Sequence, residues 1–267
     1  MTLSIRSSQR TGWLAILFFT QFISLAGSEP SAESQHVAKY GTMPFNARYL
    51  LPSGGVEMSV DWLTLPEERI LVLTFDDGPD ERDRQMAALL TRHAIPATFF
   101  YVASRVAAMP GMVGEMLAGH YTVGYHSNRH QKLSAFSPSR LTEEFQQGQA
   151  ILAGQGVHPT WFRPPYGDFN DQVVKTAQEH GMETILWTID SRDWAGVTAP
   201  TMARNVIRRF HPGAVLLFHS TRAATLQAMP AIVEAAAKAN YRFVSLDEWR
   251  SILQRASRRR QKPAEAP

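Results

Sequence analysis

Residues 69–80 read RILVLTFDDGPD, and this stretch decides which fold to expect. Five of the six residues from Ile70 to Phe75 are apolar, so the run predicts a buried strand. Asp76 and Asp77 follow directly, although like charges repel and the desolvation of a carboxylate is costly. The Asp-Gly-Pro sequence that they begin is also typical of a turn. The pair therefore predicts either a turn or a site that compensates two negative charges.

The chain beyond this strand alternates short apolar runs with helical patterns. Strands are predicted at 70–75, 98–102, 121–125, 161–163, 184–189, 215–218 and 242–245, and helices at 83–93, 111–119, 141–153, 171–180, 202–210 and 226–239. Such alternation indicates a parallel sheet with crossover helices. Seven or so repeats in roughly 180 residues favour an α/β fold, a distorted (β/α) barrel of about seven parallel strands, whose functional residues follow the C-terminal ends of the strands.

The first 27 residues have the features of an export signal. Arg6 and Arg10 precede an apolar segment that ends in the small residues 26–28. The apolar run is shorter than the ~20 residues of a membrane span, and an uncleaved anchor is the alternative. We therefore expect a signal peptide at 1–27 and an exported protein, periplasmic or extracellular.

Composition divides the rest of the 267-residue chain into three parts. Proline and glycine breakers at 28–67 predict a linker and irregular lead-in, 68–253 is the folded domain, and 254–267 is a basic tail that we expect to be disordered. The net charge of +3 comes from the ends: 1–27 contribute +2 and the tail +4, which leaves −3 for the middle. The tail is either simply solvated or contacts an anionic envelope polymer or membrane surface. Export argues against nucleic acid as a partner, and we expect a monomer.

Two histidines follow the predicted strand 121–125. His126 and His130 are four residues apart, which predicts that both imidazoles lie on one helical turn. Histidine is the commonest metal ligand at neutral pH. Two histidines with one aspartate make a three-ligand set that leaves positions open for water and substrate.

Three further predicted strands end in polar groups. Arg163, in the segment WFRPPYG at 161–167, belongs either to a rigid proline loop or to a site where its fixed cation meets the two carboxylates. The segment TIDSRDW at 188–194 adds Asp190, Asp193 and Trp194. In VLLFHS at 215–220, strand alternation puts Leu217 and His219 on the same face, so an apolar wall and an imidazole are expected to share one cavity.

Taken together, these segments resemble the NodB-like polysaccharide deacetylases, carbohydrate esterase family four. The resemblance covers about residues 69–250, in five motifs: TFDDGP at 74–79, HSNRH at 126–130, RPPYG at 163–167, DSRDW at 190–194 and LFH at 217–219. Two minor departures are Ser220, where an aspartate often follows the histidine, and Ala239-Asn240, where glycine is common.

The resemblance implies a metal site and a base. Asp77, His126 and His130 would hold a divalent metal, usually zinc, with cobalt, iron and manganese as alternatives. Asp76 would be the general base, steadied by Arg163.

It also implies an acid and a substrate pocket. His219 would be the general acid, with Asp193 orienting it and raising its pKa. The backbone N–H of Tyr166 would help to hold the oxyanion, while Trp194 and Leu217 would line the pocket for the acetyl methyl group.

The function that the resemblance implies is metal-dependent hydrolysis of the N-acetyl group of N-acetylglucosamine residues in a polysaccharide. We expect peptidoglycan as the first substrate, because an exported protein meets it first, and chitin oligosaccharides as the second. The alternatives are an O-acetyl esterase acting on a polysaccharide such as acetylxylan, and a catalytically silent glycan-binding protein.

Overall fold

The computed structural model describes residues 48–50, 56–58 and 66–261. The predicted export signal at 1–27 and residues 262–267 lie outside these ranges, as does most of the predicted lead-in. Among the described helices, none combines the length and the apolar character needed to cross a membrane.

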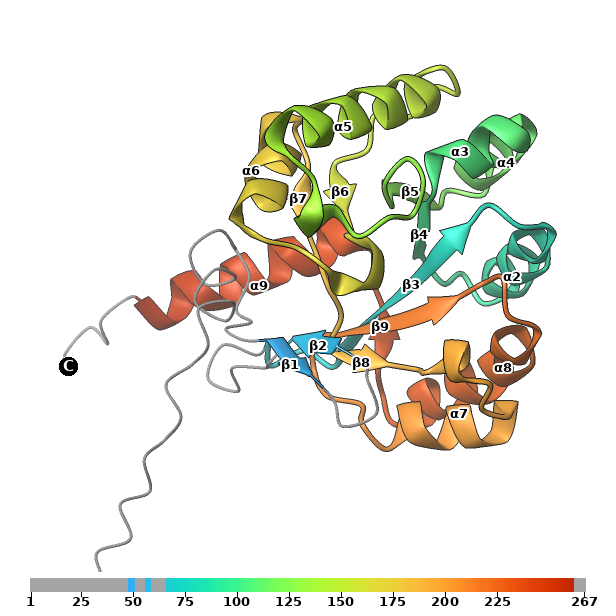
Figure 1. Ribbon diagram of the computed structural model, residues 1–267. Coiled ribbons are helices and arrows are strands. Elements are labelled where there is room, and N and C mark those ends of the chain that lie inside the picture. Colours follow the sequence, from blue (N-terminus) through green and yellow to red (C-terminus); the bar gives the residue numbers. More distant parts are fainter. Residues whose placement is uncertain (1–47, 51–55, 59–65, 262–267) are drawn as a thin grey trace, which may run out of the picture.

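A parallel sheet forms the centre of the molecule (Figure 1). Its strands are β3 (Ile70–Gly78), β4 (Ala97–Tyr101), β5 (Thr122–Tyr125), β6 (Trp161–Phe162), β7 (Glu183–Thr184), β8 (Ile189–Asp190), β9 (Ala214–His219) and β10 (Arg242–Phe243). Their order is β7-β6-β5-β4-β3-β9-β8, and β10 pairs with the beginning of β3. The curved parallel sheet confirms the predicted distorted barrel.

Helices surround this sheet (Figure 1). They are α2 (Glu81–Arg92), α3 (Ala103–Ala108), α4 (Pro110–Ala118), α5 (Pro138–Ala153), α6 (Asp171–Glu179), α7 (Ala199–Ile207), α8 (Ala223–Lys238) and α9 (Leu246–Gln261). The six predicted helices are confirmed, whereas α3 and α9 were not predicted. Helix α9 includes residues 254–261, so the expectation of a disordered tail was wrong for this part of it. Its first half packs Trp249, Ile252 and Leu253 into the core, and the helix continues from these residues to Gln261.

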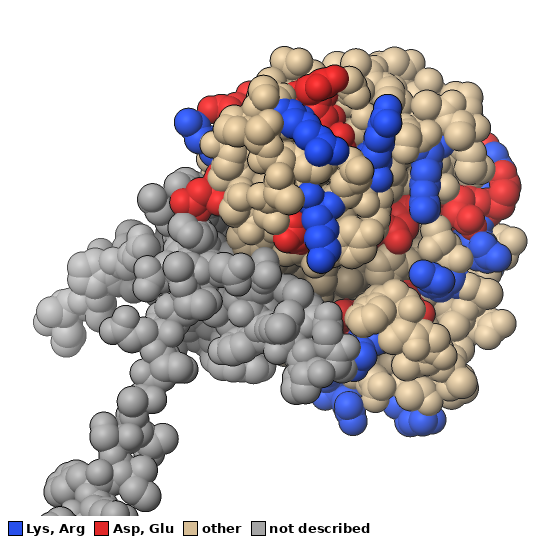
Figure 2. Space-filling model, in the orientation of Figure 1, with Lys and Arg blue, Asp and Glu red and all other residues tan. Residues whose placement is uncertain are grey.

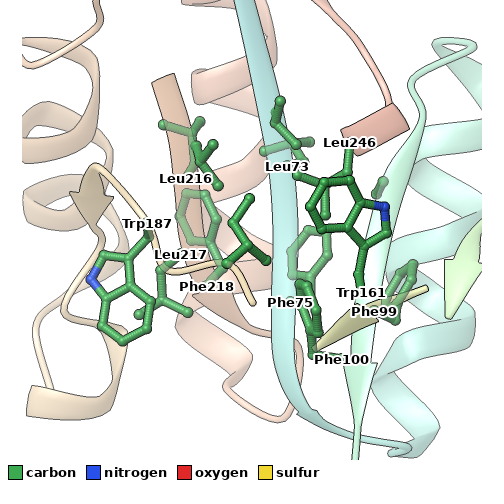
Figure 3. Packing of buried hydrophobic residues seen from close by; sticks show 14 of the residues in the cluster. Leu73, Phe75, Phe99, Phe100, Trp161, Trp187, Leu216, Leu217, Phe218 and Leu246 are labelled. Atoms are coloured by element: carbon green, nitrogen blue, oxygen red, sulfur yellow. The ribbon is translucent and has the colours of Figure 1, made fainter. Parts of the chain in front are cut away.

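The central strand β3 is buried along its apolar length because it has neighbours on both sides. Residues 70–75 are fully buried, and β3 pairs with β4 on one side and β9 on the other. Phe75 stacks on Phe99 of β4 with ring centroids 5.1 Å apart and lies 6.0 Å from Phe218 of β9 (Figure 3). This near-continuous apolar run is what a parallel strand covered on both faces requires. It fixes the C-terminal end of β3 beside those of its neighbours.

The predicted strand 184–189 is divided in the structure. Its start belongs to β7, which pairs with β6, and its end belongs to β8, which pairs with β9 at the other edge of the sheet. The amide of Ile185 still donates to Phe162, while that of Thr188 donates to Val215. The segment therefore links the two edges of the sheet. A single straight strand cannot pair with both edges, which is why the prediction of one strand was wrong.

Within the predicted irregular lead-in, the structure describes a short antiparallel ladder. It is formed by β1 (Arg48–Leu50) and β2 (Val56–Met58).

Candidate active site

The C-terminal ends of the strands bring the predicted residues to one cavity of about 390 Å³. Its lining comprises Asp76, Asp77, His126, His130, Tyr166, Trp187, Asp190, Trp194, Leu217, His219 and Arg222. The two remaining predicted residues, Arg163 and Asp193, are buried behind this lining and contact it. All ten predicted site residues are therefore brought together. The sequence did not single out Trp187 or Arg222.

Asp76 and Asp77 both face the cavity because the strand is irregular at this point. Successive side chains of a regular strand point to opposite faces. The pairing of β3 with β4 shifts register between Asp76 and Gly78, and Asp77 has a left-handed backbone with φ of 70°. Such a bulge redirects a side chain. The bulge turns the side chain of Asp77 to the cavity side, where that of Asp76 also lies.

Asp77, His126 and His130 form a compact group of potential metal ligands, with one donor atom from each lying within 4.8 Å of the others. Nε2 of His130 is 2.9 Å and Nε2 of His126 is 3.4 Å from Oδ1 of Asp77. His126 also places Nδ1 2.7 Å from the backbone carbonyl of Arg163. Because a carbonyl only accepts, Nδ1 carries the proton, and the Nε2 lone pair is left for a ligand.

This donor set fits a divalent metal. Oδ1 of Asp77 is buried and receives no well-formed hydrogen bond, although two imidazole nitrogens face it. Burial alone would raise the pKa of Asp77, but the imidazoles of His126 and His130 outweigh it and hold that pKa well below its usual range. The carboxylate is therefore ionised, as a metal ligand must be.

The two histidines do not share a helical turn, so that part of the prediction was wrong. Residues 126–130 form an irregular loop after β5, in which Ser127 and His130 have left-handed backbones with φ of 67° and 54°. The amide of His130 donates to Oγ of Ser127 at 2.8 Å, which closes the loop. The imidazoles meet through this turn, with ring centroids 5.1 Å apart.

Glu144 of helix α5 stabilises the same loop by binding two of its backbone amides. Its side chain is buried, and Oε1 accepts the amides of Asn128 and Arg129 at 2.8 and 3.2 Å. Sequence reasoning missed this residue. The available signal was its position on the apolar face of the helix, three residues after Leu141 and beside Phe145.

Arg163 neutralises the second aspartate. It is fully buried, and Nη1 donates to Oδ1 of Asp76 at 2.9 Å and to the hydroxyl of Thr74 at 2.7 Å. Its other donors reach the carbonyls of Ile185 and Leu186. Burial lowers the pKa of Arg163, and the Asp76 carboxylate opposes this by stabilising the cation. The strand can end in two carboxylates because an arginine holds one and two imidazoles face the other.

His219 and Asp193 form a second ionisable pair. Nδ1 of His219 lies 2.6 Å from Oδ1 of Asp193, whose Oδ2 accepts the His219 amide and the Thr225 hydroxyl, each at 2.6 Å. Burial alone would lower the pKa of His219, but the Asp193 carboxylate outweighs it and raises that pKa to about 9. The imidazole is therefore protonated at neutral pH and can donate a proton into the cavity.

Apolar and aromatic side chains complete the cavity. Leu217 is buried on β9, on the same strand face as His219. Trp194 and Tyr166 are 38% and 56% exposed, and the Trp194 indole donates to Asp190 at 3.2 Å. Exposed rings beside a polar cleft suit stacking against sugar rings.

Comparison with known proteins gives the family. The profile of the family described as Polysaccharide deacetylase matches residues 65–185. A peptidoglycan-N-acetylglucosamine deacetylase of Bacillus cereus is 34% identical over 195 residues, 71% of this chain and 92% of that protein. A chitooligosaccharide deacetylase of a Bradyrhizobium species is 32% identical over 154 residues, 57% of this chain and 70% of that protein. The chain belongs to the polysaccharide deacetylase family.

Solved structures share the fold. That of the peptidoglycan deacetylase PdaC of Bacillus subtilis has a TM-score of 0.67 at 28% identity and covers 74% of this chain and 99% of its own. A CE4 family pseudoenzyme from Bacillus anthracis has a TM-score of 0.67 at 26% identity and covers 69% and 66%. Since one fold accompanies both a deacetylase and a pseudoenzyme, activity depends on the residues of the site rather than on the fold.

Proposed function

We propose that this protein hydrolyses the N-acetyl group of N-acetylglucosamine residues in a polysaccharide and releases acetate. Peptidoglycan is the first substrate and chitin oligosaccharides are the second. One observation supports this proposal: three kinds of functional group meet at one cavity. They are the potential metal ligands Asp77, His126 and His130, the candidate base Asp76, and the His219–Asp193 pair. The names of the two relatives support the substrate class.

Asp77, His126 and His130 would hold a divalent metal. Imidazole and carboxylate ligands suit zinc, and cobalt, iron and manganese are alternatives. When bound, the metal would supply a Lewis acid for the acetyl carbonyl and lower the pKa of a water molecule.

Asp76 takes the proton of the attacking water. Its Oδ1 is engaged by Arg163, whereas its Oδ2 lies 3.7 Å from Nε2 of His126, on the side of the ligand set. The arginine fixes the carboxylate in one orientation, which a positioned general base requires.

His219 delivers a proton to the departing nitrogen. An amine anion is a very poor leaving group, so amide hydrolysis needs an acid at this atom. Asp193 keeps the imidazole protonated and orients it through Nδ1. Leu217 and Trp194 enclose the acetyl methyl group, and the backbone N–H of Tyr166 stabilises the developing oxyanion.

Mass spectrometry with a panel of acetylated glycans tests the function. Purified protein is incubated with N-acetylglucosamine oligomers, peptidoglycan fragments and acetylxylan, and each acetyl lost lowers the mass by a fixed amount. Loss from the first two supports the proposal. Loss from acetylxylan alone would make the protein an O-acetyl esterase, and binding without any loss would make it a glycan-binding protein.

We also propose that the protein is exported to the periplasm or beyond the cell, where it meets its polymer. The basis is the composition of residues 1–27. The cations of residues 254–267 would then contact the anionic envelope, and the protein would act as a monomer.

A further inference from the structure

Arg222 lines the cavity but has no role in the mechanism above. It is exposed, and in the part of the chain that the structure describes no carboxylate pairs with it. The three aspartates that line the cavity already have partners: Asp76 has Arg163, Asp77 has the imidazoles of His126 and His130, and Asp190 has the Trp194 indole. Arg222 therefore brings an unpaired positive charge to the edge of the cavity.

The backbone of Arg222 is tied to the acid pair. Its amide donates to the carbonyl of His219 at 3.1 Å, and its own carbonyl accepts the amide of Thr225 at 3.1 Å. The hydroxyl of Thr225 in turn donates to Asp193. This tight turn between β9 and α8 fixes the backbone position of Arg222, three residues after His219.

Arg222 follows His219 in the chain, on the side away from Leu217. His219 protonates the nitrogen that stays on the sugar, whereas Leu217, two residues earlier, faces the acetyl methyl group. A neutral N-acetylglucosamine unit offers a guanidinium only uncharged acceptors: its hydroxyl, ring, glycosidic and acetamido carbonyl oxygens. A carboxylate adds its opposite charge and matches the planar guanidinium with two parallel hydrogen bonds.

The face of the molecule shown in Figure 2 has no broad region of one charge. On the visible face, basic side chains stand singly with acidic side chains among them (Figure 2). This face therefore has no extended positive region that would attract an anionic polymer. A single cation at the cavity would act locally.

We propose that Arg222 binds a carboxylate of the substrate, so that the enzyme prefers a β-linked N-acetylglucosamine polymer with carboxylates beside the reacting sugar. This inference rests on the proposed function and narrows its substrate class. Peptidoglycan has the required chemistry, because alternate sugars carry a lactyl ether that ends in a carboxylate or in a peptide with carboxylates. Chitin oligosaccharides are neutral and lack it.

Four tetrasaccharides test the proposal through kcat/KM for acetate release. They are an N-acetylglucosamine tetramer, a peptide-free peptidoglycan tetrasaccharide with free lactyl carboxylates, the same compound with these converted to methyl amides, and a peptide-bearing form. Arg222→Gln is expected to lower kcat/KM about 3- to 10-fold on a carboxylated substrate and to leave the two uncharged ones within about twofold. Loss on the peptide-free form assigns the carboxylate to the lactyl ether, and loss confined to the peptide-bearing form assigns it to the peptide.

Lys238→Gln is the matched control. It removes the same charge from the opposite end of the same helix, about 24 Å away at 1.5 Å per residue. This variant should leave every kcat/KM unchanged. Equal losses for Arg222→Gln on all substrates, or the same pattern with Lys238→Gln, would overturn the carboxylate proposal and leave the deacetylase function intact. A wild-type protein that releases acetate from none of the four would overturn the proposed function itself.

Discussion

Two adjacent aspartates have different environments and therefore different expected roles. Asp76 is buried and held by Arg163, whereas Asp77 is half-buried and faces two imidazole nitrogens. The difference arises from one left-handed residue, since the bulge at Asp77 changes its direction without changing its chemistry. Replacing each aspartate in turn by asparagine, its isosteric amide, tests the two roles separately.

Asp76→Asn should retain the metal and lose roughly 10²- to 10⁴-fold in kcat, the usual scale for a positioned general base. Asp77→Asn should lose metal as well as activity, because the remaining two imidazoles make a weaker site. Elemental analysis beside rate measurements separates the two. If only Asp77→Asn were inactive while both variants kept the metal, the two roles would be reversed.

The pH profile should report the His219–Asp193 pair. A general acid works in its protonated form, so kcat should fall as the pH rises through about 9, the raised pKa of His219. In Asp193→Asn the carboxylate that raises this pKa is gone and burial lowers it, so the alkaline limb should move to lower pH. At pH 8 this should reduce kcat about tenfold or more.

Thr225→Val is the control for this shift. It removes one hydrogen bond to Asp193 but keeps the charge. Its alkaline limb should remain where the wild type has it. A limb that moves equally in both variants would show that packing rather than the Asp193 charge sets the profile.

At the scale of elements, helix α5 positions the loop that carries both histidines. Glu144 holds two loop amides, and Gly148, one helical turn further on, lies where a Cβ would overlap the Tyr125 ring at the end of β5. The close contact between α5 and β5 places the Glu144 carboxylate within hydrogen-bond distance of the loop amides. The ligand geometry therefore depends on a helix that supplies no ligand.

Glu144→Leu should weaken metal binding about 10- to 100-fold, the usual effect of removing an outer partner of a metal site. It leaves two loop amides without their acceptor, which costs about 1–3 kcal/mol for each buried donor. Metal affinity is measured by competition with a chromophoric chelator, and stability by urea unfolding.

Two variants on the same helix control this experiment. Glu144→Gln keeps an acceptor oxygen and should restore most of the metal affinity. Glu143→Gln alters an exposed neighbour that bonds only Gln147 among the described residues, and should change nothing. Equal affinity in Glu144→Leu and the wild type would exclude the supporting role.

At the scale of the whole molecule, Arg163 joins parts of the barrel that are distant in sequence. From the end of β6 it bonds Thr74 and Asp76 on β3, together with two carbonyls of the segment that links the sheet edges. Its guanidinium also lies 4.3 Å from the Phe100 ring centroid. One side chain thus connects the core, the edge closure and the candidate base.

Arg163→Leu should lower the free energy of unfolding by about 3–5 kcal/mol, because it leaves the buried Asp76 charge without its partner. Urea unfolding of chelator-treated protein measures the loss. The double variant Arg163→Leu, Asp76→Asn should recover part of it, since no unpaired charge then remains. A double variant as unstable as the single one would assign the loss to the arginine's contacts with Thr74 and the backbone.

Much of the fold and the site could be predicted from the sequence because strand ends of a parallel sheet converge. The apolar run before Asp76 predicted β3, and the polar groups after each strand predicted the cavity. The sequence did not predict the division of 184–189, because its pairing depends on two strands at opposite edges. Helices α3 and α9 were also missed.

Residue types and their order along the strands specify which chemical groups reach the site: carboxylates, imidazoles and a guanidinium. How these groups face one another depends on the folded backbone. The bulge at Asp77 and the left-handed turn at His130 are backbone conformations that local composition does not specify. The contacts of Glu144 and the exposure of Arg222 depend on which helix packs under which loop. Such contacts join residues distant in sequence, so they exist only once the chain has folded.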